Sequence, residues 1–313
     1  MSRTAATPNM EVITADGLTW VNIENPSEEE INYLAENYPF HPLDLDDTIS
    51  RRQRPKYDSY KDYDFFVMHF PKYRKDERVL SSTQVSFFIG KEYLVTVHSG
   101  ELKPLTKLFR ECQIDEESRQ EYFESGSGFL MYTIVDRLVD YCQPIVDKIM
   151  NSLEEIEEVV FTPGIPPKNL IKKISTLRRD TFSFRRTMLP MRIVIKDFEK
   201  RVSKYAEKNL SVYFGDMVDH AEHLWFALDE IKEIADVLFD TYFILSMDRF
   251  NDIMRILAVL ATIVTPITFI SSIYGMNIEL PIQNETFAFV IIIGIMAAVI
   301  AGALYLFRRL HLI

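Results

Sequence analysis

The sequence predicts an α+β membrane protein with an N-terminal cytosolic α/β domain, a long helical stalk and two C-terminal transmembrane helices. Three observations predict this fold class. Two long uncharged runs lie close to the C-terminus, a helical pattern continues without a breaker for about 60 residues, and strand-like segments are confined to roughly the first 115 residues. We place the α/β domain at 1–128, the stalk at 129–250 and the transmembrane domain at 251–313.

The two C-terminal uncharged runs are long enough to cross a bilayer. Residues 256–278 form a run of 23 and residues 286–307 a run of 22. A helix rises about 1.5 Å per residue, so roughly 20 apolar residues cross the hydrocarbon core. We therefore expect spans at about 254–274 and 287–307, joined by an outer loop at 275–286. Buried helices of a soluble protein are the alternative, but such helices usually carry charge on one face.

Basic residues mark the predicted cytosolic side of the membrane. Arg255 precedes the first run, and Arg308 and Arg309 follow the second, whereas the linker contains Glu279 and Glu285 but no base. Because Lys and Arg are enriched in cytosolic loops, both termini are expected in the cytosol. The first 17 residues lack an apolar core, so no signal peptide is predicted. We expect a multi-pass protein of the cell (inner) membrane.

Composition excludes several classes of function. The formal net charge is −11, and this excess lies before Ile256. An acidic chain is a poor partner for nucleic acid, and no Gly-rich run ending in Gly-Lys-Ser/Thr predicts a nucleotide site. Cys112 and Cys142 are not spaced as a metal-binding pair. The cysteines and the six histidines form no recognisable nucleophile–base arrangement, so we do not expect an enzyme.

Local patterns predict the elements of the α/β domain. Ser27 and Glu30 have the spacing of a capping box, which predicts that a helix begins there. Segments 63–69, 84–89 and 93–97 are rich in β-branched and aromatic residues, and charged or Gly-containing turns separate them. These segments are typical of a meander of strands.

Long helices are predicted from residue 129 onward. The first should run over 129–160 with a kink at Pro144, and residues 162–167 form a break. The second should extend to about 204 with a bend at Pro190. The third begins near 210 and enters the first span, with no breaker before Pro266. A helix of that length implies a bundle or an oligomer.

Two blocks of charge lie on the first and second of these helices. The acidic block ends the first helix, and the basic block lies on the second; their members are Glu154, Glu155, Glu157 and Glu158, and Lys168, Lys172, Lys173, Arg178, Arg179, Arg185 and Arg186. We favour a solvated hairpin whose opposite charges face each other. Contact of the basic block with lipid headgroups or nucleic acid is the alternative.

The first span carries a polar stripe. Two spans cannot enclose a polar path, so a pore would need several copies, each lending one helix. Steps of three and four residues place one set of side chains along one helix face: Asn251, Met254, Ala258, Ala261, Thr265, Thr268 and Ser272. The same face extends inward to Asp240, where a ring of acids would concentrate cations. The alternative is that Ser and Thr bond backbone carbonyls or pack against neighbouring helices.

The end of the first span carries a motif. Tyr274-Gly275-Met276-Asn277 ends it, after Asn251-Asp252-Ile253-Met254 and Pro266-Ile267-Thr268-Phe269-Ile270. With these segments the chain resembles the CorA family of magnesium channels, whose signature is Gly-Met-Asn at the outer end of the first of two C-terminal spans. The resemblance covers most of the chain. It implies a homopentameric funnel in the lipid bilayer, with the first-span helix lining the pore.

The resemblance also implies roles for individual residues. Gly275, Met276 and Asn277 would form the selectivity site, and Glu279 and Glu285 would attract cations in the outer loop. Mg²⁺ sheds its water reluctantly, so the neutral amide oxygen of Asn277 suits the hydrated ion. The pore-lining set implied by the resemblance and the stripe together is Asn251, Met254, Leu257, Ala261, Thr265, Thr268, Ser272 and Asp240. In relatives, a bulky apolar residue often stands where this chain has Thr265.

Regulation by cytosolic Mg²⁺ between subunits is a further implication of the resemblance. Asp216 falls where one regulatory ligand is expected, and Asp76 is a stand-in for its partner in the N-terminal domain. The leading hypothesis is passive entry of hydrated Mg²⁺ down its electrochemical gradient. A transporter of Zn²⁺, Co²⁺ or Ni²⁺ is the second, since His220 and His223 offer imidazoles. A non-conducting membrane sensor or scaffold is the third.

Overall fold

The computed structural model describes residues 9–50, 53–74, 79–162, 167, 169–276 and 287–309. The chain divides into two compact units, Met1–Phe239 and Asp240–Ile313, called unit 1 and unit 2 below. Unit 1 contains one sheet and most of the helices. Unit 2 contains the end of the longest helix and the C-terminal helix. The three-part division at 128 and 250 stays a prediction.

Unit 1 is built on a six-stranded sheet in the order β1-β2-β6-β5-β4-β3. The strands are β1 (Met10–Ala15), β2 (Leu18–Glu24), β3 (Lys56–Ser59), β4 (Asp64–Arg74), β5 (Val79–Ile89) and β6 (Tyr93–His98). Neighbours pair antiparallel except β2 and β6, which are parallel with Val21 opposite Val95. The parallel pair joins the N-terminal hairpin to the meander of β4, β5 and β6.

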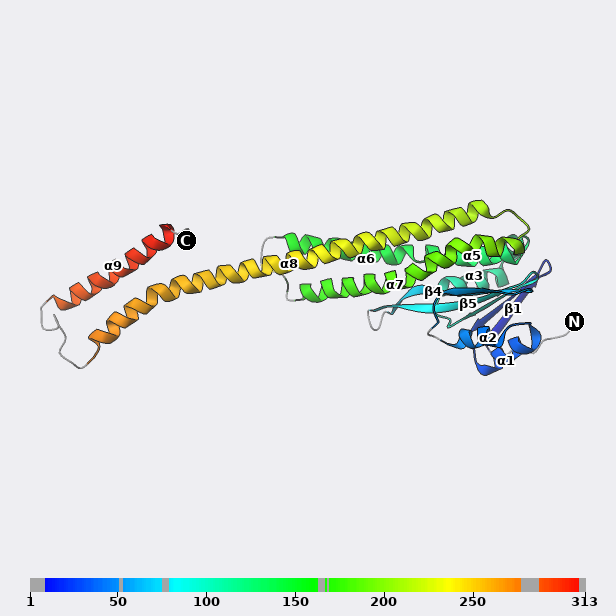
Figure 1. Cartoon of the computed structure of the whole chain (residues 1–313), viewed down its shortest axis with the longest axis horizontal. Helices are drawn as coiled ribbons and strands as arrows, with labels where there is room; N and C mark the ends of the chain where they lie inside the picture. Colours follow the sequence, from blue (N-terminus) through cyan, green and yellow to red (C-terminus); the bar gives the residue numbers. More distant parts are fainter. Residues whose placement is uncertain are drawn as a thin grey trace. The chain divides into compact units, whose positions relative to one another are not determined.

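Helices cover both faces of this sheet (Figure 1). Helices α1 (Glu28–Asn37) and α2 (Pro42–Ile49) pack on one face through a buried cluster that includes Leu34, Leu45 and Phe88. The other face contacts α3 (Lys103–Ile114) and α7 (Leu170–Val202), through the ring pairs Trp20–Phe109 and Phe66–Phe198. Helices α4 (Glu116–Phe123) and α5 (Ser127–Asp140) follow α3.

The structure confirms several sequence predictions for the first 161 residues and corrects one of them. The capping box is present, with Ser27 accepting from the backbone and Glu30 accepting from the Ser27 N–H. The three predicted strands lie within β4, β5 and β6, apart from Tyr63, which precedes β4. The single kinked helix predicted over 129–160 is wrong. The chain forms α5 and then α6 (Gln143–Phe161), because Pro144 lacks an N–H and occupies the first turn of a new helix.

The long helices are joined by regular apolar seams. Helix α7 is followed by the short 3₁₀ turn η1 (Ser203–Tyr205) and then by the long helix α8 (Ser211–Tyr274). Buried side chains recur in alternating steps of three and four residues on α6, on α7 and on the part of α8 that belongs to unit 1. On α8 this seam is Phe214, Met217, Ala221, Leu224, Leu228, Ile231, Ala235 and Leu238. A heptad spacing is the pattern of coiled coils, in which such side chains interlock between helices. As predicted, α7 continues through Pro190 and α8 through Pro266.

A ladder of ion pairs joins α7 to α8. Arg178 contacts Asp236 at 2.8 Å, Arg185 contacts Asp229 at 2.7 Å, and Arg192 contacts Glu222. Each helix supplies its partners every seven residues, and the order is reversed, so α7 and α8 run antiparallel. The favoured interpretation of the basic block is therefore corrected for Arg178 and Arg185. Their acidic partners lie on α8, not in the acidic block of α6.

Aromatic rings reinforce this ladder. The guanidinium groups of Arg185 and Arg192 each lie 4.9 Å from the centroid of the Trp225 ring, and that of Arg178 lies 4.7 Å from Phe239. Exposed ion pairs contribute little individually, but cation–π contacts add to them when the cation is partly desolvated. The ladder therefore fixes the register between α7 and α8.

A buried polar network crosses β2 and β6. The Trp20 Nε1–H donates to Thr96 at 3.1 Å, and Thr96 donates to the Asn22 Oδ1 at 2.7 Å. The Gly100 N–H donates to His98 Nδ1 at 3.0 Å, so Nε2 carries the proton and donates to Asn22 Oδ1. Burial lowers the pKa of His98 to about 4. The network therefore requires a neutral imidazole.

We expect acid to destabilise unit 1 through His98. Its pKa is about 4 when folded and 6.5 when unfolded, so its stabilising effect is present above pH 6.5 and is lost as pH falls toward 4. Between about pH 7 and about pH 4.5 the loss is roughly 2 to 3 kcal/mol of unfolding free energy. Burial also lowers the pKa of His69, which adds a loss of the same sign.

Thermal melts of the full chain at the two pH values measure this effect. The His98→Gln variant should be less stable near neutral pH and should lose less stability on acidification than the wild type. Carboxylate contributions are common to both proteins and cancel in the comparison. Parallel losses of melting temperature in wild type and variant would contradict the assignment.

Candidate functional site

The polar stripe predicted from the sequence lies on α8 in unit 2. Its members Asn251, Ala261, Thr265, Thr268 and Ser272 are all exposed in the single chain. Met254 is 48% exposed and Leu257 52% exposed, although both are apolar. Asp240 is also exposed, and the exposed Ile244 and Met247 connect it to Asn251 in steps of four and three. One face of α8 thus runs uncovered from residue 240 to 272.

A different face of α8 is half-buried. Its members are Val259, Ile263, Pro266, Ile270 and Ile273, again in steps of three and four. Successive residues turn by about 100° around a helix, which places this set opposite the polar stripe. Helix α9 (Ala288–Arg309) runs antiparallel to the end of α8, and its half-buried set includes Ile292, Met296 and Ala303. The polar stripe is therefore not covered within one chain.

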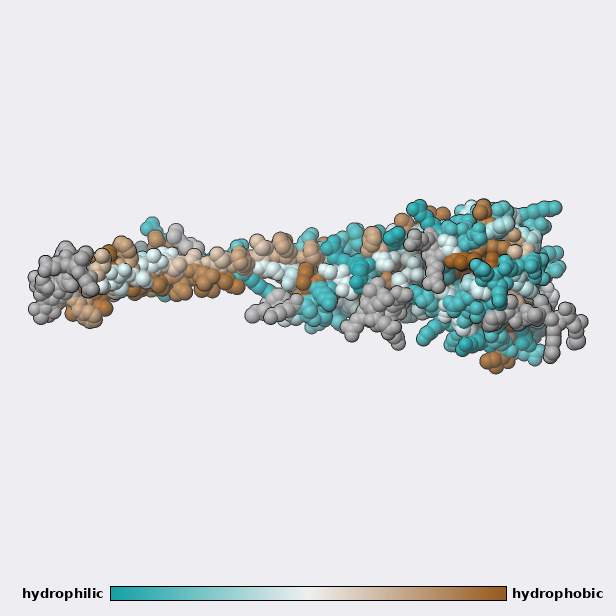
Figure 2. Space-filling model, turned by 90° about the horizontal axis from the view of Figure 1, so that it is seen from below, coloured by the Kyte–Doolittle hydropathy of each residue, from teal (hydrophilic) through white to brown (hydrophobic). Residues whose placement is uncertain are grey.

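Two helices are long and apolar enough to cross a membrane by length and composition. They are α8, with a mean hydropathy of 2.2 in its most apolar 18-residue window, and Phe289–Arg309, with 2.7. Neither window contains a buried residue. Figure 2 shows mostly hydrophobic surface over the later part of α8 and α9, and mostly hydrophilic surface over unit 1. Such exposed apolar surface in unit 2 requires lipid or further protein around it.

Threonine hydroxyls on α8 bond to the preceding turn. The Thr262 hydroxyl donates to the Ala258 carbonyl at 2.8 Å, and the Thr268 hydroxyl donates to the Val264 carbonyl at 3.0 Å. Bonding to backbone carbonyls was the alternative interpretation for the Ser and Thr side chains of this span. It holds for Thr268 on the stripe and for Thr262, which lies outside the stripe. A donating hydroxyl still keeps oxygen lone pairs, so Thr268 can accept a hydrogen bond from water on its exposed side.

Helix α8 ends immediately before the Gly-Met-Asn motif. The Gly275 N–H donates to the Ser271 carbonyl at 2.9 Å, and the Met276 N–H to the Ile273 carbonyl at 3.2 Å. Among the described glycines, positive φ occurs at positions 17, 100 and 126, so Gly275 is not a left-handed cap. A Cβ at Gly275 would lie 3.2 Å from the Ser271 carbonyl oxygen, so a side chain at this position would crowd the end of the helix.

Several predicted site residues lie outside the described residues. These are Asn277, Glu279 and Glu285 between α8 and α9, and Asp76 between β4 and β5. The described part of the proposed selectivity site is Gly275 and Met276, of which Met276 is 50% exposed.

Asp216 belongs to a group of polar side chains between α5 and α8. His220, one turn further along α8, lies 3.8 Å from Asp216 and 3.4 Å from Asp140. Burial and the neighbouring Asp140 raise the pKa of Asp136 to about 6, while His220 acts in the opposite direction. Asp216 also raises the pKa of Asp136. Three carboxyl groups from two helices are thus close enough to repel one another.

Sequence reasoning missed Asp136 and Asp140. They stand four residues apart on α5, which puts them on one face of that helix, but about 80 residues separate them from Asp216. Among the residues that the structure describes, no group of three or more His, Cys, Asp or Glu side chains is arranged to hold a metal ion. The group at Asp216 is therefore at most part of a cation site.

His220 and His223 stand three residues apart on α8, which makes them neighbours on the helix surface. His220 lies 3.4 Å from Asp140 and 3.8 Å from Asp216, and His223 is exposed. Among the described residues, no group of three or more potential ligands that includes these histidines is arranged to hold a metal ion.

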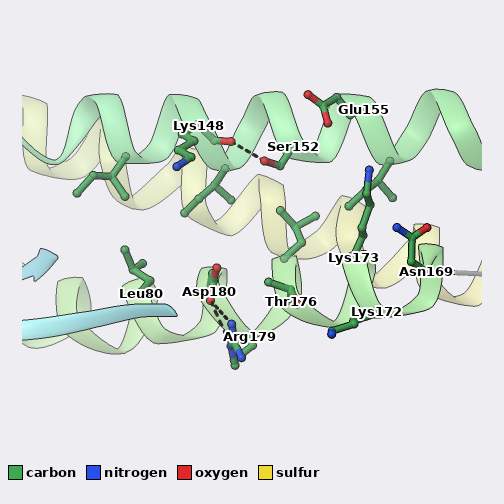
Figure 3. Close-up of a pocket in the computed structure, with 14 residues that line it drawn as sticks. Leu80, Lys148, Ser152, Glu155, Asn169, Lys172, Lys173, Thr176, Arg179 and Asp180 are labelled. Carbon is green, nitrogen blue, oxygen red and sulfur yellow. Dashed lines mark hydrogen bonds and ion pairs between the residues drawn. The ribbon is translucent and has the colours of Figure 1, made fainter. Parts of the chain in front are cut away.

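A cleft of about 600 Å³ lies between α6 and α7 (Figure 3). Buried Ile149, Ile156 and Leu177 line it together with charged residues of both signs. The Arg179 guanidinium contacts Asp180 at 3.1 Å, and the Ser152 hydroxyl donates to the Lys148 carbonyl at 2.9 Å. Four basic and two acidic side chains line this cleft, so it carries both signs of charge with a basic excess.

Comparison with known proteins identifies the family. The family model of the CorA-like Mg²⁺ transporter protein matches residues 15–309. The putative metal ion transporter YfjQ of Bacillus subtilis is 31% identical over 92% of this chain and 88% of its own length. The cobalt/magnesium transport protein CorA of Thermotoga maritima is 28% identical over 93% and 82%. The zinc transport protein ZntB of Yersinia pseudotuberculosis is 20% identical over 95% and 89%.

A solved structure shares the fold. The complete CorA magnesium transporter from Methanocaldococcus jannaschii superposes with a TM-score of 0.79 at 24% identity, covering 95% of this chain and 92% of that one. The sheet with its long helices, the two candidate spans and the match over nearly the whole sequence agree. The chain belongs to the CorA-like Mg²⁺ transporter family and is a CorA-like divalent cation transporter.

Proposed function

We propose that several copies of this chain surround an aqueous path lined by α8 and conduct hydrated Mg²⁺ into the cytosol. One observation carries the proposal: the polar stripe from Asn251 to Ser272 is exposed on the face of α8 opposite its half-buried face. A polar face in a membrane is stable only against water or protein. A homopentamer, as the sequence resemblance implies, brings these faces together around one axis.

The chemistry of the stripe suits an ion that keeps its water. Thr265, Thr268 and Ser272 offer hydroxyl oxygens, which bind a hydrated cation through its water molecules. Asp240 supplies a carboxylate at the inner end. At the outer end, the oxygens of the 275–277 motif would select Mg²⁺, with Glu279 and Glu285 drawing cations toward it. Weak, repeated sites of this kind permit conduction, because the ion can leave each one.

The orientation follows from charge. Arg255 lies before the first span, and Arg308 and Arg309 end α9. The positive-inside rule then puts both ends of the hairpin, and unit 1 with them, in the cytosol. In this orientation the membrane potential, negative inside, drives Mg²⁺ inward without nucleotide.

Ion flux into proteoliposomes tests the proposal. Purified full-length protein should admit Mg²⁺ to vesicles that contain a Mg²⁺-sensitive dye, and an inside-negative potential should accelerate entry. Co²⁺, Ni²⁺ and Zn²⁺ are offered in parallel. Zn²⁺ flux that Mg²⁺ does not inhibit would identify a transition-metal transporter instead. Absence of flux for every ion would support a non-conducting sensor or scaffold.

Cytosolic Mg²⁺ is proposed to act at the group around Asp216. Asp136, Asp140 and Asp216 supply the oxygen ligands that Mg²⁺ prefers. Burial is the main cause of the raised pKa of Asp136, and repulsion by Asp140 and Asp216 adds to it; a bound cation would relieve this repulsion. Because three acids alone do not form a closed site, a neighbouring subunit would complete it, and Asp76 is the proposed contributor.

Mg²⁺ is therefore expected to raise the melting temperature of unit 1. At about ten times its dissociation constant, a ligand adds about 1.4 kcal/mol, or roughly 3 to 6 °C. Asp216→Asn should lose most of this increase. Asp219→Asn, an exposed acid three residues away, is the matched control and should keep it. An equal increase in Asp216→Asn and wild type would remove Asp216 from the site.

A further inference from the structure

A groove of about 830 Å³ lies between α3 and the end of α5 in unit 1. Its lining consists of Gly100, Lys103, Pro104, Thr106, Lys107, Arg110, Arg137, Asp140 and Tyr141. The volume lies within the range of small-molecule sites, about 300 to 1,000 Å³. Four of the lining side chains are cations and one is an acid. This balance is opposite to that of the chain, whose net charge is −11.

The three cations of α3 share one helix face. Lys103, Lys107 and Arg110 follow at steps of four and three residues, and all are exposed. Within the described ranges, none of the three makes an ion pair or a side-chain hydrogen bond. By contrast, Arg178, Arg185 and Arg192 of α7 each contact an acid of α8. The positive charge of α3 is thus not neutralised by a direct ion pair, although two acids lie nearby: Glu111, which interacts electrostatically with Lys107, and Glu24, which accepts from Thr106 at 2.8 Å.

The rest of the groove adds rigid polar and apolar surface. Arg137 of α5 is held by Glu111 at 2.8 and 3.3 Å, and it donates to the Tyr122 hydroxyl at 2.7 Å. Glu111 therefore balances the charge of Arg137, and these hydrogen bonds fix the position of its guanidinium group in the groove. Asp140 is the acid among the lining residues of the groove, and it lies 3.4 Å from His220.

The start of α3 strengthens the positive field. The helix begins at Lys103, and its cap residue Leu102 provides no side-chain hydrogen bond. Pro104 has no N–H, and the Leu105 and Thr106 N–H groups donate to the Leu102 carbonyl, so the Lys103 N–H is the donor that this helix N-terminus offers. Lys103 and Gly100 lie at this end of the groove, so the helix terminus and the α3 cations act on the same region.

We propose that this groove binds a polyphosphate anion of nucleotide size. The rise from Lys103 to Arg110 is about 10 Å along the helix, which a single phosphate cannot span and a chain of three phosphates can. Lysine and arginine form strong charge-assisted hydrogen bonds to phosphate oxygens. Pro104 and Tyr141 offer apolar surface for the remainder of the ligand. The site is separate from the ion path along α8.

Equilibrium binding to the full chain in detergent micelles tests this proposal. Titration calorimetry in Mg²⁺-free buffer uses inorganic triphosphate, ATP, inorganic phosphate and adenosine as probes. We expect saturable binding of triphosphate and ATP that weakens with added salt, and much weaker binding of phosphate and adenosine. Because the readout is binding, it does not depend on ion flux.

Charge variants locate the site. The triple variant Lys103→Gln, Lys107→Gln, Arg110→Gln should bind triphosphate at least about tenfold more weakly, because three charge-assisted bonds are lost. Lys172→Gln, Lys173→Gln on α7 removes exposed lysines elsewhere and should bind within about twofold of wild type. All of these side chains are exposed, so the melting temperatures should stay equal. Absence of triphosphate binding to wild type, or undiminished binding to the triple variant, would overturn the proposal.

Discussion

Replacing Asn277 by alanine is expected to reduce Mg²⁺ uptake into proteoliposomes by at least about tenfold. The amide oxygen is proposed to accept hydrogen bonds from water bound to Mg²⁺, and such bonds to a charged partner are worth about 1.5 to 3 kcal/mol each. Every subunit would lose one acceptor at the same level of the pore. The measurement is the initial rate of Mg²⁺ entry at fixed membrane potential.

Asn284→Ala provides the matched control for this experiment. It removes the same amide from the same segment, residues 275–287, between α8 and α9. The proposal predicts uptake close to wild type for Asn284→Ala and loss of uptake for Asn277→Ala. Equal rates in the two variants would show that the Gly-Met-Asn motif does not select the ion, even if the protein conducts.

Ser272→Cys is expected to make Mg²⁺ uptake sensitive to a cationic thiol reagent. Ser272 lies on the exposed polar stripe near the C-terminal end of α8, so a bulky positive group attached there would obstruct the proposed path and repel the ion. We expect at least about a tenfold fall in rate after labelling. The native Cys112 and Cys142 are fully buried, so the wild type should show little change.

The neighbouring serine makes this a test of helix orientation. Ser271 is also exposed, but it lies about 100° around α8 from Ser272. Ser271→Cys should therefore keep its uptake after treatment. Block of Ser271→Cys with Ser272→Cys unaffected would mean that a different face of α8 lines the path.

The sequence predicted those helices and strands whose residue pattern is contained within the element itself. Enrichment in β-branched and aromatic residues between charged or Gly-containing turns indicated β4, β5 and β6, and the absence of breakers indicated α8 as one helix from near residue 210 into the first span. The first hairpin was missed, although Asp16 and Gly17 are the two-residue turn typical of such hairpins, with φ of 51° and 78°. The pairing of β2 with β6 could not be predicted, because it joins residues about 75 positions apart.

Within the candidate site, too, the sequence predicted residues that share one helix and missed residues brought together by packing between helices. Periodicity found the stripe on α8, since its members lie on one helix. The neighbours of Asp216 were missed because Asp136 and Asp140 reach it only through the packing of α5 against α8. Likewise, the sequence pattern indicated that the acids facing Arg178 and Arg185 lie on α6, the preceding helix, whereas they lie on α8. The seven-residue spacing of the partners on α7 and α8 fixes this pairing, and it can be recognised only when the alignment of the two helices is known.

The parallel contact between β2 and β6 also sets an order of events during synthesis. The β1–β2 hairpin leaves the ribosome first, but its inner edge has no partner until β6, about 70 residues later, has been made. Until then β2 presents unpaired N–H and C=O groups beside Trp20, a template for association with other chains. Closing this long loop is slow relative to local pairing. The N-terminal hairpin is therefore the part of the chain in which a nascent protein most needs protection from aggregation.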